Sequence, residues 1–296
     1  MEPDWPGEAG PAPAMPVWHL TVAYDGGAYH GWQLQPDRPT VQGILRDRLR
    51  ILFNAPELRI QGTSRTDAGV HALDQQVTFT PPAAAPELTP EHVRHVLNRW
   101  LPRDIRVLDC ELREPGFNAR FAAAGKAYTY AIANSNGISP FESRYAWVYG
   151  KRLDVAAMRA AAAGLEGTHD FASFAANARR EAEDTVRTVW RVELLPRGDW
   201  LFLNVIGESF LYKMVRAFAG FLVHVGRGSC RPSAVREVLA ARNRCAAADS
   251  APPQGLFLAR VFWRPDAWRD YVPELPPWRP REPAVQATLA GREMMP

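Results

Sequence analysis

The stretch "GTSRTDAGVHALDQ" at residues 62–75 places an arginine, a threonine and an aspartate between small, flexible residues. Gly62 and Gly69 allow the backbone to turn sharply or to approach another molecule closely. An aspartate in such a turn is either a capping carboxylate or a reactive one. Asp67 is therefore the first candidate for chemistry, and the rest of the chain has to decide between the two roles.

Arg216 is the second candidate, because it lies in the run "FLYKMVRAFAGFLVHVG", which is apolar nearly all round. This pattern predicts a buried helix, which we expect to start at Ser209. A buried guanidinium is costly unless a carboxylate pairs with it. No acidic residue follows Glu208 in this run, so Asp67 is a good candidate partner. Alternatively, Arg216 extends to solvent or pairs with a surface acid. Lys213, three residues earlier, is expected on the same helix surface and could simply be solvated.

Tyr128 and Tyr130 lie two residues apart in "KAYTYAI", so they point to the same face of a predicted strand. They could form a stacking platform for a ligand or belong to the core. The histidines His71, His169 and His224 have no spacing that indicates a metal site. We expect these side chains to be hydrogen-bonded or packed.

Alternating strands and helices must position these residues. The stretches "LRIQGT" and "QQVTFT" read as strands, so the Asp67 motif is predicted to connect them. Thr40, Thr89-Pro90 and Asp154 are typical of helix starts, and another helix is expected near Ser233. Several strands follow one another directly, which favours an α+β fold with antiparallel sheet. Further strands are expected in "VWHLTVAYDG", "DIRVLDCEL", "KAYTYAIA", "TVRTVWRVELL", "WLFLNVIGES" and "LFLARVFW".

Composition places the chain among globular proteins. Its 296 residues are 47% hydrophobic and 23% charged, and no apolar run is long enough to cross a bilayer. The proline-rich, acidic N-terminus lacks the pattern of a secretory signal. Three scattered cysteines indicate reduced thiols in a cytoplasmic protein. The net charge is only +3, yet just three of the 35 basic residues are lysine. Arginine suits phosphate contacts, although genome composition could equally explain its excess.

The strand and helix order is similar in two parts of the chain, which predicts two related halves. We expect a flexible tail at residues 1–16, an N-terminal α+β half carrying the Asp67 loop at residues 17–115, a C-terminal α+β half at residues 116–265, and a proline-rich tail at residues 266–296. Tryptophans in the last tail indicate that part of it packs on the protein.

Several blocks occur in an order that resembles the bacterial tRNA pseudouridine synthase A family. The most specific is "SRTDAGVHALDQ" at 64–75, where Ser64 replaces a glycine found in many members. The resemblance runs from about residue 17 to 265, essentially the whole predicted folded region. The other blocks are "YDGGAYHGWQLQ" (24–35), "FNARF" (117–121), "KAYTYAI" (126–132), "GTHDFASF" (167–174), "RTV" (187–189), "FLYKMVR" (210–216) and "GL" (255–256).

This resemblance implies a role for each candidate residue. Asp67 would be the catalytic carboxylate, acting on the sugar, on the base or on a ribose proton. Arg216 would fix its direction and favour its charged form. Tyr128 would stack on the target base and assist proton transfer at C5. The implied substrate-binding residues are Arg65, Lys213 and Leu256, with Arg65 occupying space or binding phosphate as the uridine leaves its stack.

The resemblance also implies an activity: isomerisation of uridines 38, 39 and 40 in the tRNA anticodon stem-loop to pseudouridine. It implies no cofactor or metal, a homodimer in the cytoplasm, and two antiparallel halves meeting at a basic RNA-binding cleft. The loop arginines Arg179 and Arg180 are plausible phosphate contacts, or they are simply balanced by Glu181 and Glu183.

Two other functions compete with the isomerase. A catalytically silent tRNA-binding or tRNA-folding protein would lack one of the residues Asp67, Tyr128 and Arg216, and all three are present. A hydrolase with an aspartate nucleophile would need a second acid or base, usually with a histidine or metal cluster, and the sequence shows none. The sequence therefore favours the isomerase.

Overall fold

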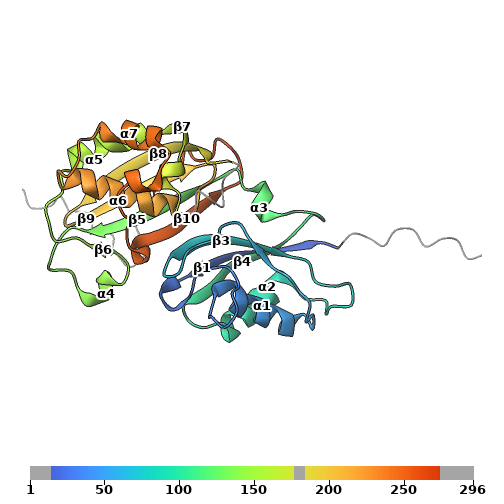
Figure 1. Cartoon of the computed structure of the whole chain (residues 1–296). Coiled ribbons are helices and arrows are strands. Elements are labelled where there is room, and N and C mark those ends of the chain that lie inside the picture. Colours follow the sequence, from blue (N-terminus) through green and yellow to red (C-terminus); the bar gives the residue numbers. More distant parts are fainter. Residues whose placement is uncertain (1–14, 177–183, 274–296) are drawn as a thin grey trace, which may run out of the picture.

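The computed structural model describes residues 15–176 and 184–273 and contains one large sheet flanked by helices (Figure 1). This confirms the predicted α+β class. The main strands lie in the order β4-β1-β3-β10-β5-β9-β8-β7, while β2 pairs with β3 and β6 with β5. The strands are β1 (Val17–Tyr24), β2 (Gln61–Gly62), β3 (His71–Phe79), β4 (Ile105–Arg113), β5 (Gly125–Ala133), β6 (Trp147–Val148), β7 (Gly167–Asp170), β8 (Val186–Arg197), β9 (Trp200–Gly207) and β10 (Leu256–Phe262).

A short parallel pairing joins two parts of this sheet whose main strands are antiparallel. On the β3–β10 side, only Phe257 with His71 and Leu258 with Ala72 are in register. On its other side, β10 pairs antiparallel with β5 along its length. The last strand within the described residues therefore lies in the middle of the sheet. The division at residues 115 and 116 stays a prediction, although the N-terminal strands β1, β3 and β4 do form one end of the sheet.

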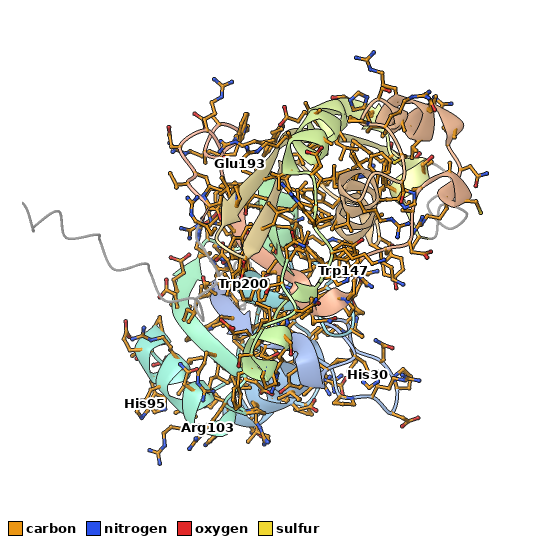
Figure 2. The ribbon with its side chains drawn as sticks, turned by 90° about the vertical axis from the view of Figure 1, so that its left-hand side faces the viewer. His30, His95, Arg103, Trp147, Glu193 and Trp200 are labelled. Atoms are coloured by element: carbon orange, nitrogen blue, oxygen red, sulfur yellow. The ribbon has the colours of Figure 1, made fainter. Side chains whose placement is uncertain are left out.

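Each end of the sheet carries its own helices (Figure 1). The predicted caps are confirmed: the side chains of Thr40, Thr89 and Asp154 each accept a hydrogen bond from a backbone N–H in the first turn of their helices. Figure 2 shows His95 at one end of the molecule and Glu193 at the other. The helices are α1 (Val41–Leu52), α2 (Pro90–Trp100), α3 (Ala119–Ala122), α4 (Pro140–Ser143), α5 (Val155–Ala162), α6 (Met214–Gly226) and α7 (Ala234–Ala241).

Helix α6 is buried as predicted, but its expected start at Ser209 is wrong. It begins at Met214, because Lys213 adopts the left-handed backbone conformation with φ of 61° and cannot continue a right-handed helix. Lys213 is therefore not a neighbour of Arg216 on the helix surface. Residues 209–213 therefore form a non-helical connection before α6, and their side chains can line a site.

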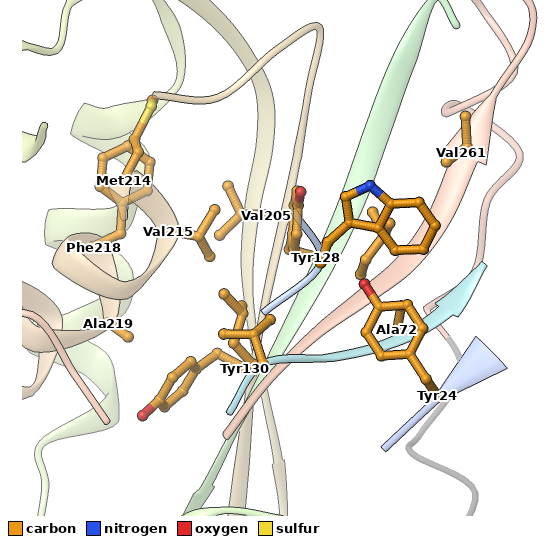
Figure 3. Packing of buried hydrophobic residues seen from close by; sticks show 14 of the residues in the cluster. Tyr24, Ala72, Tyr128, Tyr130, Val205, Met214, Val215, Phe218, Ala219 and Val261 are labelled. Atoms are coloured by element: carbon orange, nitrogen blue, oxygen red, sulfur yellow. The ribbon is translucent and has the colours of Figure 1, made fainter. Parts of the chain in front are cut away.

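The core packs α6 against the sheet. In Figure 3, Val215 and Ala219 of α6 face the strand that carries Tyr128 and Tyr130, and Val205 of β9 lies beside them. Eleven of the thirteen helix residues are buried. This apolar contact fixes the position of the first turn of α6, where Arg216 lies.

The two predicted tails fall mostly outside the described residues, which exclude 1–14 and 274–296. The part of the second tail that is described does pack on the protein. The Trp268 ring stacks on that of Trp190 with 5.6 Å between centroids, and its carbonyl accepts a hydrogen bond of 2.9 Å from Arg191 Nη2.

Candidate active site

The Asp67 loop connects β2 and β3, as the sequence predicts. The expected strand at residues 58–63 is shorter than predicted, because only Gln61 and Gly62 pair with β3. Gln75 of β3 holds the loop from behind: its side-chain Nε2 donates to the Ser64 carbonyl at 2.7 Å, and its Oε1 accepts from the Ser64 N–H at 3.1 Å. A buried side chain thus replaces the missing strand hydrogen bonds, and the loop has a fixed shape.

A second segment packs tightly against this loop at Gly31. Gly31 has a φ of +88°, and a Cβ there would lie 2.5 Å from the Thr66 carbonyl oxygen. The Trp32 N–H donates to that same carbonyl at 3.0 Å. Asp67 is therefore presented by a backbone that two other segments support.

Asp67 and Arg216 form an ion pair. Arg216 Nη1 donates to Asp67 Oδ2 at 2.8 Å, and each side chain is only 12% exposed. Arg216 Nε donates to the carbonyl of Ala251 at 2.8 Å, so the guanidinium is held at two edges. The predicted pairing is confirmed, and the alternative of a solvent-directed Arg216 is wrong. A carboxylate aimed by a fixed guanidinium is suited to act as a nucleophile or base.

The segment that carries Ala251 crosses α6 at Gly220. A Cβ on Gly220 would lie 1.9 Å from the Asp249 carbonyl oxygen, so no side chain fits there. We expect Gly220→Ala to push this segment away and to lower the free energy of unfolding by about 1–3 kcal/mol, measured by urea denaturation. Gly137→Ala is the control, because a Cβ there meets only Ser135 Oγ at 3.7 Å. Equal stability of the two variants would contradict this prediction.

The two tyrosines on one face of β5 have different surroundings. The Tyr130 hydroxyl donates to the Pro252 carbonyl at 2.7 Å, so it is a core residue. Tyr128 lies against Phe210 with 5.1 Å between ring centroids, and it lines the same cleft as Asp67. Burial raises the pKa of the Tyr128 hydroxyl to about 12; the Ser64 hydroxyl opposes this shift and the Asp67 charge adds to it. Tyr128 is therefore a neutral hydroxyl at ordinary pH.

A cleft of about 1420 Å³ opens in front of these residues. Five of the predicted site residues line this cleft: Asp67, Tyr128, Arg65, Lys213 and Leu256. The sixth, Arg216, lies behind Asp67 and pairs with it. Asp67 is the single carboxylate among the described lining residues. The basic lining residues are Arg38, Arg59, Arg65, Arg120, Lys126, Arg187 and Lys213.

The residues predicted to bind substrate differ in exposure. Arg65 is exposed and makes no ion pair or side-chain hydrogen bond with any described residue, whereas Leu256 is buried at the wall. The Lys213 ammonium lies 5.1 Å from the centroid of the Tyr212 ring. The loop arginines Arg179 and Arg180 lie outside the described residues.

Sequence reasoning missed five of the seven basic residues that line the cleft, and three of these five lie in motif blocks. Arg120, Lys126 and Arg187 lie in the blocks "FNARF", "KAYTYAI" and "RTV", which carried the resemblance but received no role. Their charge was visible in the sequence. Their convergence was not, because the fold brings them together from α3, β5 and β8.

The three histidines are hydrogen-bonded, which agrees with the expectation of hydrogen-bonded or packed side chains; His224 Nδ1 lies 2.9 Å from Arg227 Nη2. His71 Nε2 lies 3.2 Å from the Gln254 carbonyl, and His169 Nε2 lies 2.8 Å from that of Glu166. Within residues 15–176 and 184–273, no three metal-ligating side chains cluster around a common point. No helix in this part of the chain is long and apolar enough to span a membrane.

Comparison with known proteins gives one consistent result. The family described as tRNA pseudouridine synthase matches residues 20–121 and 161–263. The tRNA pseudouridine synthase A of Bacillus subtilis (strain 168) is 39% identical over 244 residues, covering 82% of this chain and 97% of that protein. That of Bacillus pumilus is 42% identical over 82% of this chain and 97% of its own length. That of Moorella thermoacetica is 41% identical over 83% of this chain and 99% of its own length.

Proposed function

Because this chain belongs to the tRNA pseudouridine synthase family, we propose that it isomerises uridines 38, 39 and 40 of the tRNA anticodon stem-loop to pseudouridine. The observation that carries the proposal is the Asp67–Arg216 ion pair beside Tyr128 in a cleft with seven basic lining residues. The reaction breaks the bond from uracil N1 to ribose C1′ and forms one from C5 to C1′. N1 gains a proton and C5 loses one, so no co-reactant is consumed.

Each residue of the site has a task in this reaction. Asp67 attacks the sugar or base, or removes a ribose proton, and Arg216 pairs with the carboxylate and fixes its direction. Tyr128 stacks on the detached uracil and holds it for the rotation, with Leu256 as the apolar wall. Arg65 is exposed and unpaired among the described residues, so it is available to occupy the place that the uridine leaves. Lys213 binds backbone phosphate.

The basic lining supports recognition of RNA by shape and backbone. Paired RNA presents a deep, narrow major groove that side chains cannot read, so phosphate and ribose contacts dominate. Such contacts suit a protein that modifies neighbouring uridines in different sequence contexts. We propose further that the enzyme works as a homodimer in the cytoplasm. Its three free cysteines are compatible with a reducing compartment, and the molar mass from sedimentation in solution tests the dimer.

Pseudouridine mapping tests the function. Unmodified tRNA from a strain that lacks this activity is incubated with the purified protein, and each pseudouridine is located. We expect new pseudouridines at positions 38, 39 and 40 and none in the control without protein. Binding of tRNA without any new pseudouridine would instead support the catalytically silent tRNA-binding protein.

A further inference from the structure

Lys126 is a basic residue of the cleft without an acidic partner. It belongs to β5, its side chain is half-buried, and it lines the same cleft as Asp67 and Tyr128. Its side chain forms no ion pair or hydrogen bond with any residue in the described ranges. Lysine is rarely buried without a partner, because its ammonium loses hydration. Stability alone therefore does not account for this side chain.

Among the described residues, no acidic side chain pairs with Lys126: Asp74 accepts a hydrogen bond of 2.7 Å from the Val261 N–H, and Glu208 is exposed beside Gly207. The register partners of Lys126 on the neighbouring strands are Gly207 of β9 and Val261 of β10. Burial, and then the charge of Arg120, lower the pKa of the Lys126 ammonium to about 8. Asp67, the single lining carboxylate among the described residues, is already bound by Arg216. The other charged groups of the cleft are Arg38, Arg59, Arg65, Arg187 and Lys213.

Arg120 is the second basic residue at this place. It belongs to the short helix α3, is exposed, and forms no side-chain hydrogen bond or ion pair with a described residue. Its guanidinium lies 5.9 Å from the centroid of the Phe121 ring, which is itself 79% exposed. The field of Arg120 disfavours the charge of Lys126. The protein thus holds two repelling cations together at the wall of the cleft.

Lys126 is also close to the reacting base of the proposed function. Lys126 and Tyr128 are two residues apart on one strand, so their side chains share a face and are separated by about 7 Å along it. A uridine stacked on Tyr128 is linked to a phosphate on each side. The nearest negative charges of the substrate would therefore enter the region of Lys126 and Arg120.

We propose that Lys126 and Arg120 form a subsite for an RNA phosphate next to the target uridine. The inference rests on the proposed function and adds to it the group that anchors the displaced nucleotide. The phosphate supplies the negative charge that the protein lacks there. Arginine can hold two phosphate oxygens with its planar fork, and lysine adds a point charge.

Such a subsite makes RNA binding depend on pH. Near pH 8 the free protein has lost part of the Lys126 proton, whereas a bound phosphate favours the ammonium form. Binding above pH 8 must therefore take up a proton, and affinity falls as pH rises, by at most about tenfold per pH unit. An arginine at position 126 stays charged over this pH range, so the RNA affinity would no longer fall as the pH rises.

Equilibrium binding of the anticodon stem-loop RNA tests the subsite. The measurements use the Asp67→Asn protein, so that the RNA stays unmodified, at pH 7.0–9.0 and several salt concentrations. We expect Lys126→Met to weaken binding about tenfold at pH 7.0. It should reduce the slope of log affinity against log salt by about 0.7–0.9, the value for one phosphate contact. The matched control is Lys151→Met, because Lys151 is exposed and does not line the cleft; it should change neither quantity.

Lys126→Arg separates a phosphate contact from a structural role. We expect it to keep the salt slope of the parent protein and to flatten the decrease of affinity between pH 8 and 9. Lys126→Met should unfold at the same or a higher urea concentration than its parent, because it removes an unpaired, half-buried charge. If Lys126→Met does not fold, the comparison of Lys126→Arg with the parent protein is sufficient to test the subsite.

Two results would overturn the subsite: an unchanged salt slope in Lys126→Met, or the same pH dependence in Lys126→Arg as in the parent protein. The proposed function fails separately, when protein with an intact Asp67 leaves every tRNA uridine unmodified. Normal pseudouridine formation together with an unchanged salt slope would reject only the phosphate subsite.

Discussion

Asp67→Asn abolishes pseudouridine formation and leaves tRNA binding intact. The amide fits the same space and can still accept a hydrogen bond from Arg216 Nη1, which lies 2.8 Å from Asp67 Oδ2. It is neither a nucleophile nor a base. We expect the single-turnover rate to fall by at least about 10⁴-fold, as when nucleophiles or bases are removed from other enzymes. The measurement is pseudouridine formed per tRNA at saturating protein.

Asp47→Asn is the matched control for this variant. Asp47 is exposed on α1 and, within the described ranges, pairs with its neighbour Arg46 alone, so its loss should leave the rate unchanged. A rate for Asp67→Asn within tenfold of that of Asp47→Asn would remove Asp67 from the chemistry. Loss of tRNA binding in Asp67→Asn would show that the aspartate is needed for binding as well.

Arg216→Met has the second largest expected effect, on both rate and stability. It removes the partner of the Asp67 carboxylate, which is only 12% exposed in the intact protein. It also removes the hydrogen bond that the Ala251 carbonyl accepts from Arg216. Removing one partner of a fully buried ion pair costs about 3–5 kcal/mol, and water in the open cleft reduces this to about 1–3 kcal/mol. The rate should fall about 100-fold or more, because the carboxylate is no longer aimed.

A double-mutant cycle isolates the pair. Asp67→Asn combined with Arg216→Met should lower the free energy of unfolding by less than the two single changes added together, because no unpaired charge remains. Urea denaturation measures all four proteins. Arg231→Met is the surface control: Arg231 and Glu237 are paired but 68% and 62% exposed, so its effect should stay below about 1 kcal/mol. If the effects of the two single changes on the free energy of unfolding simply added up in the double variant, the coupling between Asp67 and Arg216 would be contradicted.

The sequence was most informative where physical chemistry left a side chain few options. A buried arginine needs an anion, and this requirement made Asp67 a candidate partner of Arg216, beside the alternative of a solvent-directed side chain. Helix caps at Thr40, Thr89 and Asp154 were equally predictable, because their side chains satisfy backbone N–H groups.

Other features depend on contacts that local patterns do not encode. Tyr128 and Tyr130 share a face, and only the Pro252 carbonyl, 122 residues away, distinguishes the core residue from the cleft residue. The start of α6 was misplaced because nothing in the sequence marks Lys213 for a left-handed backbone. The proposal for Lys126 depends on the fold, because the sequence does not show that no described acidic side chain pairs with it.

The central position of β10 has a consequence for how the enzyme matures. This strand is the most C-terminal one among the described residues, yet it fills the gap between β3 and β5. Until residues 256–262 leave the ribosome, both neighbouring strands keep an unpaired edge, which is a site for aggregation. Asp67 and Arg216, 149 residues apart, lie in segments on either side of that gap. The sheet is therefore closed from its middle by its most C-terminal described strand, and we expect this closure to be slow, because it pairs residues that are far apart in the sequence.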